Sequence, residues 1–201
     1  GRVARECRLP GLSAWGRVGD YRAGQIQKMS NVNVYRDSHL SADDILGFGF
    51  EHVAIATGAT WRRDGVARYN LLPMAIDGRM PVLTPDDLMD GKRPSGHVVI
   101  FDDDHYYMGS VLAELLIQNG NRVTFLTPST RVAEWSFNTL EQGLIQSRLL
   151  GLGVDIRVTR AVTEVKAGAV AACCTYTGRV TEIACDAVVM VTARLPNEML
   201  I

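Results

Sequence analysis

Hydrophobic and polar residues follow their most regular pattern in the middle of the chain. Residues 97–101 form a run that is apolar after His97, which is typical of a strand buried in a parallel sheet. Residues 109–118 have the spacing of an amphipathic helix, and Asn119 and Gly120 supply a left-handed end for it. The next predicted elements are a strand at 122–126, a helix at 139–150 and a strand at 154–158. This β-α-β-α-β order predicts one mononucleotide-binding half of a doubly wound fold.

The residues after this unit predict a change from parallel to antiparallel pairing. Alternating runs at 161–166, 170–176 and 180–184 indicate a three-stranded meander, with Gly178 in its last turn. The apolar run at 187–192 then predicts a strand that returns to the parallel sheet.

The N-terminal part has weaker patterns. Helical spacing within residues 10–29 predicts a helix that begins near Ser13, and alternation at 31–35 predicts a strand. Ser41 followed by two acids resembles a capping box and predicts a short helix. Residues 51–57 then predict a short apolar strand.

Residues 61–95 follow neither the helical nor the strand periodicity. Proline and glycine residues punctuate this segment and its end from Pro73 to Gly96, and only residues 86–89 suggest a helical turn. We therefore expect an irregular, mobile crossover that ends at a domain boundary near residues 94–96.

Composition and charge exclude several classes of protein. The 201 residues are 47% hydrophobic and 21% charged, with a net charge of −1, as expected for a globular domain with its own core. No basic run is longer than Arg62 and Arg63, so neither nucleic acid nor an anionic membrane is an expected partner. Apolar runs are too short to span a bilayer and no signal peptide is visible, so we expect a cytoplasmic protein. The missing initiator methionine and abrupt ends fit an excised fragment, although a trimmed expression product would look the same.

The four cysteines provide no recognisable metal site. They are Cys7, Cys173, Cys174 and Cys185, with no C-x-x-C pair among them. Neither a structural zinc nor an iron–sulfur cluster therefore has a ligand set here, and buried free thiols are expected.

The first strand–helix turn departs from a dinucleotide-binding loop. A working loop has the pattern G-x-G-x-x-G, whose glycines allow a tight turn and close backbone approach to pyrophosphate. In the same frame this chain has Asp104 and Tyr106 at the first and second glycine positions and keeps only the third glycine, Gly109. The acids 102–104 also oppose an anion at a helix N-terminus.

The end of the second predicted strand also departs from a dinucleotide site. It ends without the acidic residue that usually binds the ribose hydroxyls, and Arg131 is interpreted as a surface residue rather than a 2′-phosphate ligand. We predict that this unit does not bind NAD(P)H. No Ser/His/Asp or Cys/His arrangement is recognisable, and His105 beside the acids is interpreted as part of a solvated loop, so no catalytic residue or metal is predicted.

Several motifs carry a resemblance to a known family. A strand ending in A-T-G-A at 56–59 and another ending in T-A-R-L-P-N at 192–197 flank the central unit, which resembles the flavoprotein disulfide reductase-like architecture. Three further motifs are R-L-P-G at 8–11, T-P-D-D at 84–87 and D-D-D-H-Y-Y-M-G at 102–109. Through them nearly the whole chain resembles the C-terminal region of the trimethylamine dehydrogenase family, whose members are FMN and iron–sulfur oxidoreductases.

The resemblance implies a fold and a set of domains. It implies a three-layer, doubly wound Rossmann-like NAD-type domain inserted into a partial FAD-type domain, with the antiparallel meander. The expected boundaries are 1–60 for the partial FAD-type, adenine-nucleotide domain, 61–95 for the crossover linker, 96–192 for the NAD-type domain and 193–201 for the return.

The resemblance also implies a parent enzyme. In this family an N-terminal TIM barrel holds FMN and a 4Fe–4S cluster and oxidises an amine, and the C-terminal region can carry ADP or FAD. The chain would then be a noncatalytic scaffold and interaction domain of a homo-oligomeric dehydrogenase acting on trimethylamine- or dimethylamine-type substrates, with an electron-transfer flavoprotein as acceptor. Two alternatives remain: an NAD(P)H-binding domain of a dienoyl-CoA-reductase-like enzyme, and a stand-alone interaction module.

Six residues are candidates for contact with a nucleotide. Thr57, Gly58 and Ala59 end a predicted strand in the FAD-type half, where Gly58 would permit close backbone approach. Asp104 and Gly109 mark the ends of the altered loop. Arg194 follows a predicted strand and could meet a phosphate, although an interdomain salt bridge is the favoured interpretation.

Overall fold

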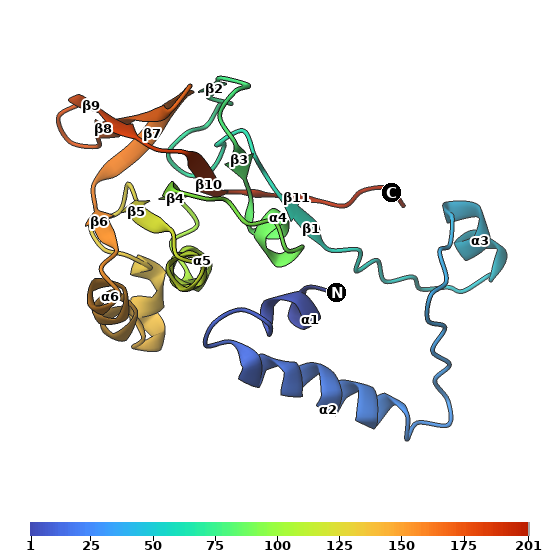
Figure 1. Cartoon of the computed structure of the whole chain (residues 1–201). Coiled ribbons are helices and arrows are strands. Elements are labelled where there is room, and N and C mark those ends of the chain that lie inside the picture. The colour runs from blue at the N-terminus through green and yellow to red at the C-terminus, as the bar shows by residue number, and fades with distance from the viewer. Residues whose placement is uncertain (201) are drawn as a thin grey trace.

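A computed structural model describes residues 1–200 and places an α/β unit beside an extended N-terminal segment (Figure 1). The helices are α1 (Arg2–Glu6), η1 (Ser13–Trp15), α2 (Gly16–Ile26), α3 (Ala42–Gly47), α4 (Pro85–Met89), α5 (Tyr107–Gln118), η2 (Glu134–Thr139) and α6 (Gln142–Gly151). The strands are β1 (Ala59–Trp61), β2 (Ala75–Ile76), β3 (Val82–Leu83), β4 (His97–Asp102), β5 (Arg122–Leu126), β6 (Asp155–Arg157), β7 (Arg160–Lys166), β8 (Ala169–Cys174), β9 (Val180–Ala184), β10 (Ala187–Val191) and β11 (Arg194–Pro196).

A five-stranded parallel sheet lies at the centre, in the order β3-β10-β4-β5-β6. The predicted β-α-β-α-β run is confirmed as β4-α5-β5-α6-β6, and α5 ends at a left-handed Gly120 with φ of 84°. The apolar run at the end of the chain is confirmed as β10, which pairs with β4 on one side and β3 on the other.

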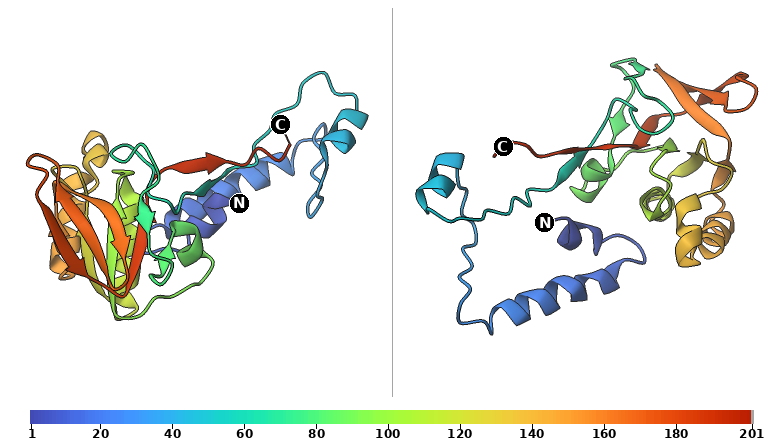
Figure 2. Two further views of the ribbon diagram at one scale, coloured as in Figure 1. Left: turned by 90° about the horizontal axis from the view of Figure 1, so that it is seen from above. Right: turned by 180° about the vertical axis from the view of Figure 1, so that it is seen from behind.

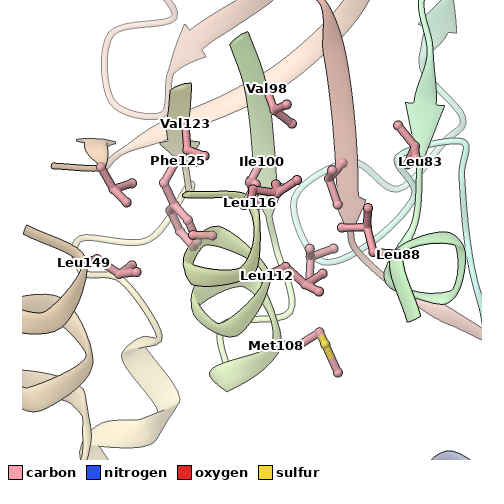
Figure 3. Close-up of a cluster of buried hydrophobic side chains, with 14 of the residues drawn as sticks. Leu83, Leu88, Val98, Ile100, Met108, Leu112, Leu116, Val123, Phe125 and Leu149 are labelled. Atoms are coloured by element: carbon pink, nitrogen blue, oxygen red, sulfur yellow. The ribbon is translucent and has the colours of Figure 1, made fainter. Parts of the chain in front are cut away.

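The two faces of this sheet are covered by different layers. Val98 and Ile100 point toward α4, α5 and α6, where Leu112, Leu116 and other apolar side chains pack (Figure 3). The alternate residue Val99 packs instead with apolar side chains of the antiparallel sheet, and that sheet lies across the other face of the parallel sheet (Figure 2). Because both faces are covered, every residue of β10 is buried. Helices thus cover one face of the parallel sheet, and the antiparallel sheet covers the other.

The predicted meander is confirmed as β7-β8-β9, with antiparallel pairing throughout and a positive φ of 68° at Gly178. A fourth strand, β2, pairs parallel with β7 and was not predicted. The fold is therefore mixed α/β, with a parallel and an antiparallel sheet.

The expectation of an irregular segment at residues 61–95 is wrong. Two short strands and α4 lie within it, and β3 completes the edge of the parallel sheet. The side chains of Trp61, Met80, Leu83 and Leu88 are buried in the two cores. A strand of two residues is too short to produce a visible periodicity, which is why the sequence pattern did not reveal it.

The N-terminal elements agree less well with the predictions. The predicted helix within 10–29 is present as η1 and α2, and α3 begins at the capping box of Ser41 and Asp44, as predicted. Residues 31–35 and 51–57 are wrongly predicted as strands, because they have no neighbouring strand among the described residues and lie exposed. Helix α1 was not predicted.

The chain enters and leaves the α/β unit side by side. Strands β1 and β11 form a two-stranded antiparallel ribbon in which Trp61 pairs with Arg194 and Ala59 pairs with Pro196 (Figure 1). The Arg62 amide extends this ribbon by donating to the Ala193 carbonyl at 2.9 Å. Among residues 1–200, the structure has no helix long and apolar enough to cross a membrane.

Candidate functional site

The candidate site lies at the carboxyl edge of the parallel sheet, where the strand order reverses. The chain runs from β4 to β5 and β6 in one direction, whereas β10 and β3 lie on the other side of β4. Ligands of open α/β sheets bind at such switch points. Two open clefts meet there, and Asp104 and Arg194 line both of them. The larger cleft has a volume of about 420 Å³ and continues between α1 and the start of α5.

The β4–α5 turn, residues 103–106, is fixed by backbone hydrogen bonds. The amides of Asp103 and Asp104 both donate to the Val191 carbonyl, at 2.9 and 3.2 Å. Asp103 also accepts from the Tyr69 amide at 2.7 Å, and His105 takes a left-handed φ of 65°. These contacts fix the backbone of the turn, and one of them uses the Asp103 side chain, which a glycine would lack.

Gly109 allows α5 to pack closely on β4. A Cβ at this position would lie 2.9 Å from Cγ of Asp102, closer than real Cβ contacts. This is the packing role expected of the third glycine of a dinucleotide loop. Whether Gly109 also lies near a nucleotide stays a prediction.

Asp102 is fully buried beneath this contact. Neither of its carboxylate oxygens has a hydrogen-bond partner, and its side chain is completely excluded from solvent. Desolvation is the main reason that the pKa of Asp102 rises to about 7, with repulsion from Asp104 and Asp103 adding to it and His105 opposing it.

An aromatic stack lies beside the turn. The rings of Tyr106 and Trp135 meet edge to face with centroids 5.4 Å apart, and the Arg68 guanidinium lies 4.3 Å from the Trp135 ring centroid. The Trp135 amide also donates to the His105 carbonyl at 3.1 Å. The second glycine position is therefore occupied by a ring that is held by η2.

Arg194 is positioned by an aromatic ring and an acid. Its guanidinium lies 4.8 Å from the centroid of Trp61, and its Nη2 is 3.8 Å from Oδ1 of Asp104. Burial raises the pKa of Asp104, and the positive charges of Arg68 and Arg2 partly oppose that shift. Both predicted residues, Asp104 and Arg194, are thus brought together.

The remaining candidates, Thr57, Gly58 and Ala59, lie at the other end of the β1–β11 ribbon. Thr57 Oγ1 donates to the Asn197 carbonyl at 2.7 Å, and the Asn197 amide donates to the Gly58 carbonyl at 2.9 Å. Gly58 has a φ of 82° and an open Cα face. The structure therefore does not gather all six candidates at one place.

Sequence reasoning missed several residues that shape this site. Arg68, Tyr69 and Trp135 come from two segments that approach the turn only in the folded chain.

Arg131, which was interpreted as a surface residue, lies 5.5 Å from the Phe137 ring centroid. Within residues 1–200 no cluster of three or more His, Cys, Asp or Glu side chains is placed to hold a metal ion.

Comparisons with known proteins add an independent line of information. Residues 83–182 match the family model of the OYE-like second alpha/beta domain. Dimethylamine dehydrogenase of Hyphomicrobium sp. (strain x) is 34% identical over 170 residues, which are 81% of this chain and 23% of that protein. Histamine dehydrogenase from Rhizobium sp. 4-9 is similar in structure, with 57% identity, a TM-score of 0.95 and coverage of 100% of this chain and 31% of that one. An amine oxidase for 6-hydroxypseudooxynicotine from Pseudomonas geniculata N1 has 43% identity, a TM-score of 0.94 and coverage of 100% and 30%. The chain thus spans between about a quarter and a third of these relatives.

Proposed function

We propose that this chain, which belongs to the trimethylamine dehydrogenase family, is the noncatalytic scaffold and interaction region of a larger flavin-dependent amine dehydrogenase. In this proposal the NAD-type domain at 96–192 is inserted into a partial FAD-type domain, and 61–95 connects the two. FMN and the 4Fe–4S cluster belong to a TIM barrel outside this chain. An electron-transfer flavoprotein receives the electrons, and the parent is a cytoplasmic homo-oligomer.

The observation that carries the scaffold assignment is the filled turn. Tyr106 occupies the position of the second loop glycine and is held against Trp135, while Asp104 places a carboxylate at the first position. A pyrophosphate needs bare backbone amides and a positive local field at this place. The residues of the β4–α5 turn therefore do not fit NAD(P)H, and we derive no hydride transfer through this unit.

Exposed apolar residues support the proposal that the chain is part of a larger protein. Leu46, Phe48 and Phe50 are each more than half exposed, and Val53 and Ile55 nearly half. Apolar side chains gathered in this way usually cover a protein interface. In the proposed parent, they would pack on the remainder of the FAD-type domain, and an adenine nucleotide there would lie near Thr57, Gly58 and Ala59.

The alternative, a competent NAD(P)H-binding domain of a dienoyl-CoA-reductase-like enzyme, is less well supported. The relatives with the highest identity reported above are named for their action on amines. The filled turn also argues against a reductase that draws hydride from NADPH.

Calorimetric titration of the full chain with NADH and NADPH tests the scaffold assignment. Each lost charge-assisted hydrogen bond to pyrophosphate is worth roughly 1.5–3 kcal/mol. Two or three such losses move a micromolar affinity into the millimolar range, since about 1.4 kcal/mol is tenfold. We expect no binding tighter than about 1 mM.

A matched variant distinguishes specific from adventitious binding. Arg131→Ala removes the exposed cation that follows β5, the one residue considered from the sequence as a 2′-phosphate ligand, without removing a buried side chain. Binding tighter than roughly 10 μM that Arg131→Ala weakens would overturn the scaffold assignment and favour the reductase. The parent activity is tested separately, by determining whether the coding sequence upstream of Gly1 encodes a barrel with cluster cysteines.

A further inference from the structure

We propose that Asp102 makes the β4–α5 turn a pH-sensitive latch, which is closed while this carboxyl group is protonated and loosens when it ionises. The latch is a property of this chain and does not depend on the proposed parent activity.

The geometry around Asp102 provides little stabilisation for a negative charge. Its side chain is completely buried and neither oxygen has a well-formed hydrogen bond, so only the nearby His105 favours the anion. Gly109 closes one side, because a Cβ there would already meet Cγ of Asp102 at 2.9 Å. On the sheet, its register partner in β10 is the apolar Val191. An unpaired carboxylate in such a place is strongly disfavoured, and the group takes up a proton instead.

The charged groups near Asp102 compensate its ionisation only in part. Within the turn, His105 favours the ionised carboxyl group, whereas Asp104 and Asp103 disfavour it and burial still raises the pKa. His105 is already engaged by Asp103, whose Oδ1 lies 3.1 Å from its Nε2. The two acids therefore oppose a second or third negative charge in the turn.

The elements packed around Asp102 add little. Strand β10 has no charged residue, and β5 has only Arg122, at its opposite end. Helix α5 has only Glu114, which pairs with Arg148 at 2.6 Å. Arg2, Arg68 and Arg194 face Asp104 instead.

The direction of the effect follows from proton linkage. The pKa of Asp102 is raised by burial to about 7, above the value of roughly 3.9 in an unfolded chain. The proton therefore stabilises the closed turn fully below roughly pH 3.9, and this stabilisation is lost progressively as the pH rises to about 7.

The turn is hydrogen-bonded to three other segments, so its opening would affect all three. Tyr69 donates its amide to Asp103, Trp135 donates its amide to the His105 carbonyl, and Val191 accepts from Asp103 and Asp104. Opening the turn would break these contacts together and free Tyr106 from Trp135. The β4–α5 turn at the switch point is thus expected to loosen progressively as the pH rises from about 4 to about 7.

Amide hydrogen exchange on the full chain tests the latch. Exchange of the Tyr69, Asp103 and Trp135 amides is measured between about pH 4.5 and 8.5, and each rate is divided by the intrinsic rate at that pH. We expect the protection of these amides to fall by up to about tenfold per pH unit below about pH 7 and to become constant above it. The Val170 amide in the antiparallel sheet should keep constant protection.

Two variants separate the latch from a general effect of pH. Asp102→Asn has nearly the same shape and cannot ionise, so its protection should not change with pH. Asp77→Asn is the matched control, because Arg79 already holds the pKa of Asp77 at about 2, and it should behave like the wild type. Protection that is independent of pH in the wild type, or that still falls in Asp102→Asn, would overturn the proposal.

A second measurement needs no variant at Asp102 and covers the case in which Asp102→Asn does not fold. Infrared difference spectra of the wild type should show a protonated carboxyl band near pH 6 that disappears by about pH 8.5. Because burial also raises the pKa of Asp104, the band should persist in Asp104→Asn. Absence of the band at pH 6, or its loss in Asp104→Asn, contradicts the latch.

Discussion

The α/β unit from β3 to β10 and the segment between α2 and β1 have similar local sequence signals but very different packing. Every residue of β10 is buried, and β4 has five buried residues of its six. In contrast, α2 has no buried residue, and in residues 27–58 only Ile45 is even partly buried. The difference shows that an apolar run forms a strand only where the chain supplies neighbours for its backbone amides and carbonyls.

The largest expected difference between the regions concerns matched leucines. Leu112 in α5 is fully buried, whereas Leu46 in α3 is 74% exposed. Leu112→Ala should lower the free energy of unfolding by about 2–5 kcal/mol, because it leaves a cavity between helix and sheet. Leu46→Ala should change it by no more than about 0.5 kcal/mol. Urea denaturation measures both, and equal costs would show that the two regions are packed alike.

Glycine-to-alanine substitution in two helices gives a smaller effect of opposite sign. Gly109→Ala places a methyl group against Asp102 and should cost about 1–3 kcal/mol by overpacking. Gly19→Ala in α2 meets open space and should stabilise that helix by up to about 1 kcal/mol. Thermal denaturation followed by circular dichroism compares the two. A stable Gly109→Ala protein would mean that α5 can move away from β4.

The smallest expected effect concerns two helix caps of the same type. Thr84 caps α4 with Asp87, and Ser41 caps α3 with Asp44, each in a complete capping box. Thr84→Ala should reduce the stability of the whole unit by about 1 kcal/mol, because α4 carries the buried Leu88 into the core. Ser41→Ala should only weaken α3 locally.

Two measurements distinguish the caps. Global unfolding reports Thr84→Ala, and amide exchange within α3 reports Ser41→Ala. A global loss of comparable size in Ser41→Ala would indicate that α3 is coupled to the core despite its exposure.

The elements of the α/β unit could be predicted because local pattern and tertiary packing agree there. The alternation of Val98, Val99, Ile100 and Phe101 reflects two different covering layers, although the sequence shows only a continuous apolar run. For the same reason the pattern did not reveal that helices cover only one face. Strand β3 was not predicted, because its two residues are recognisable as a strand only through their pairing with β10.

The site was predicted in part. The frame of Asp104, Tyr106 and Gly109 could be taken from the sequence, since the spacing of a glycine loop is fixed. The contacts that fill this loop could not be predicted, because Trp135 is 29 residues from Tyr106 in sequence and reaches it through a 3-10 helix bounded by left-handed residues. The roles of Thr57, Gly58 and Ala59 stay predictions.

The β1–β11 ribbon places the two crossings of the chain next to each other. A unit attached in this way can be removed or exchanged as a cassette, because its ends already lie at the distance of paired strands. The same attachment makes both connections bend together. A glycine or proline introduced at the outer end of this ribbon, where Ala59 pairs with Pro196, would therefore redirect both connections at once, whereas Trp61 at its inner end belongs to the core beside the helices.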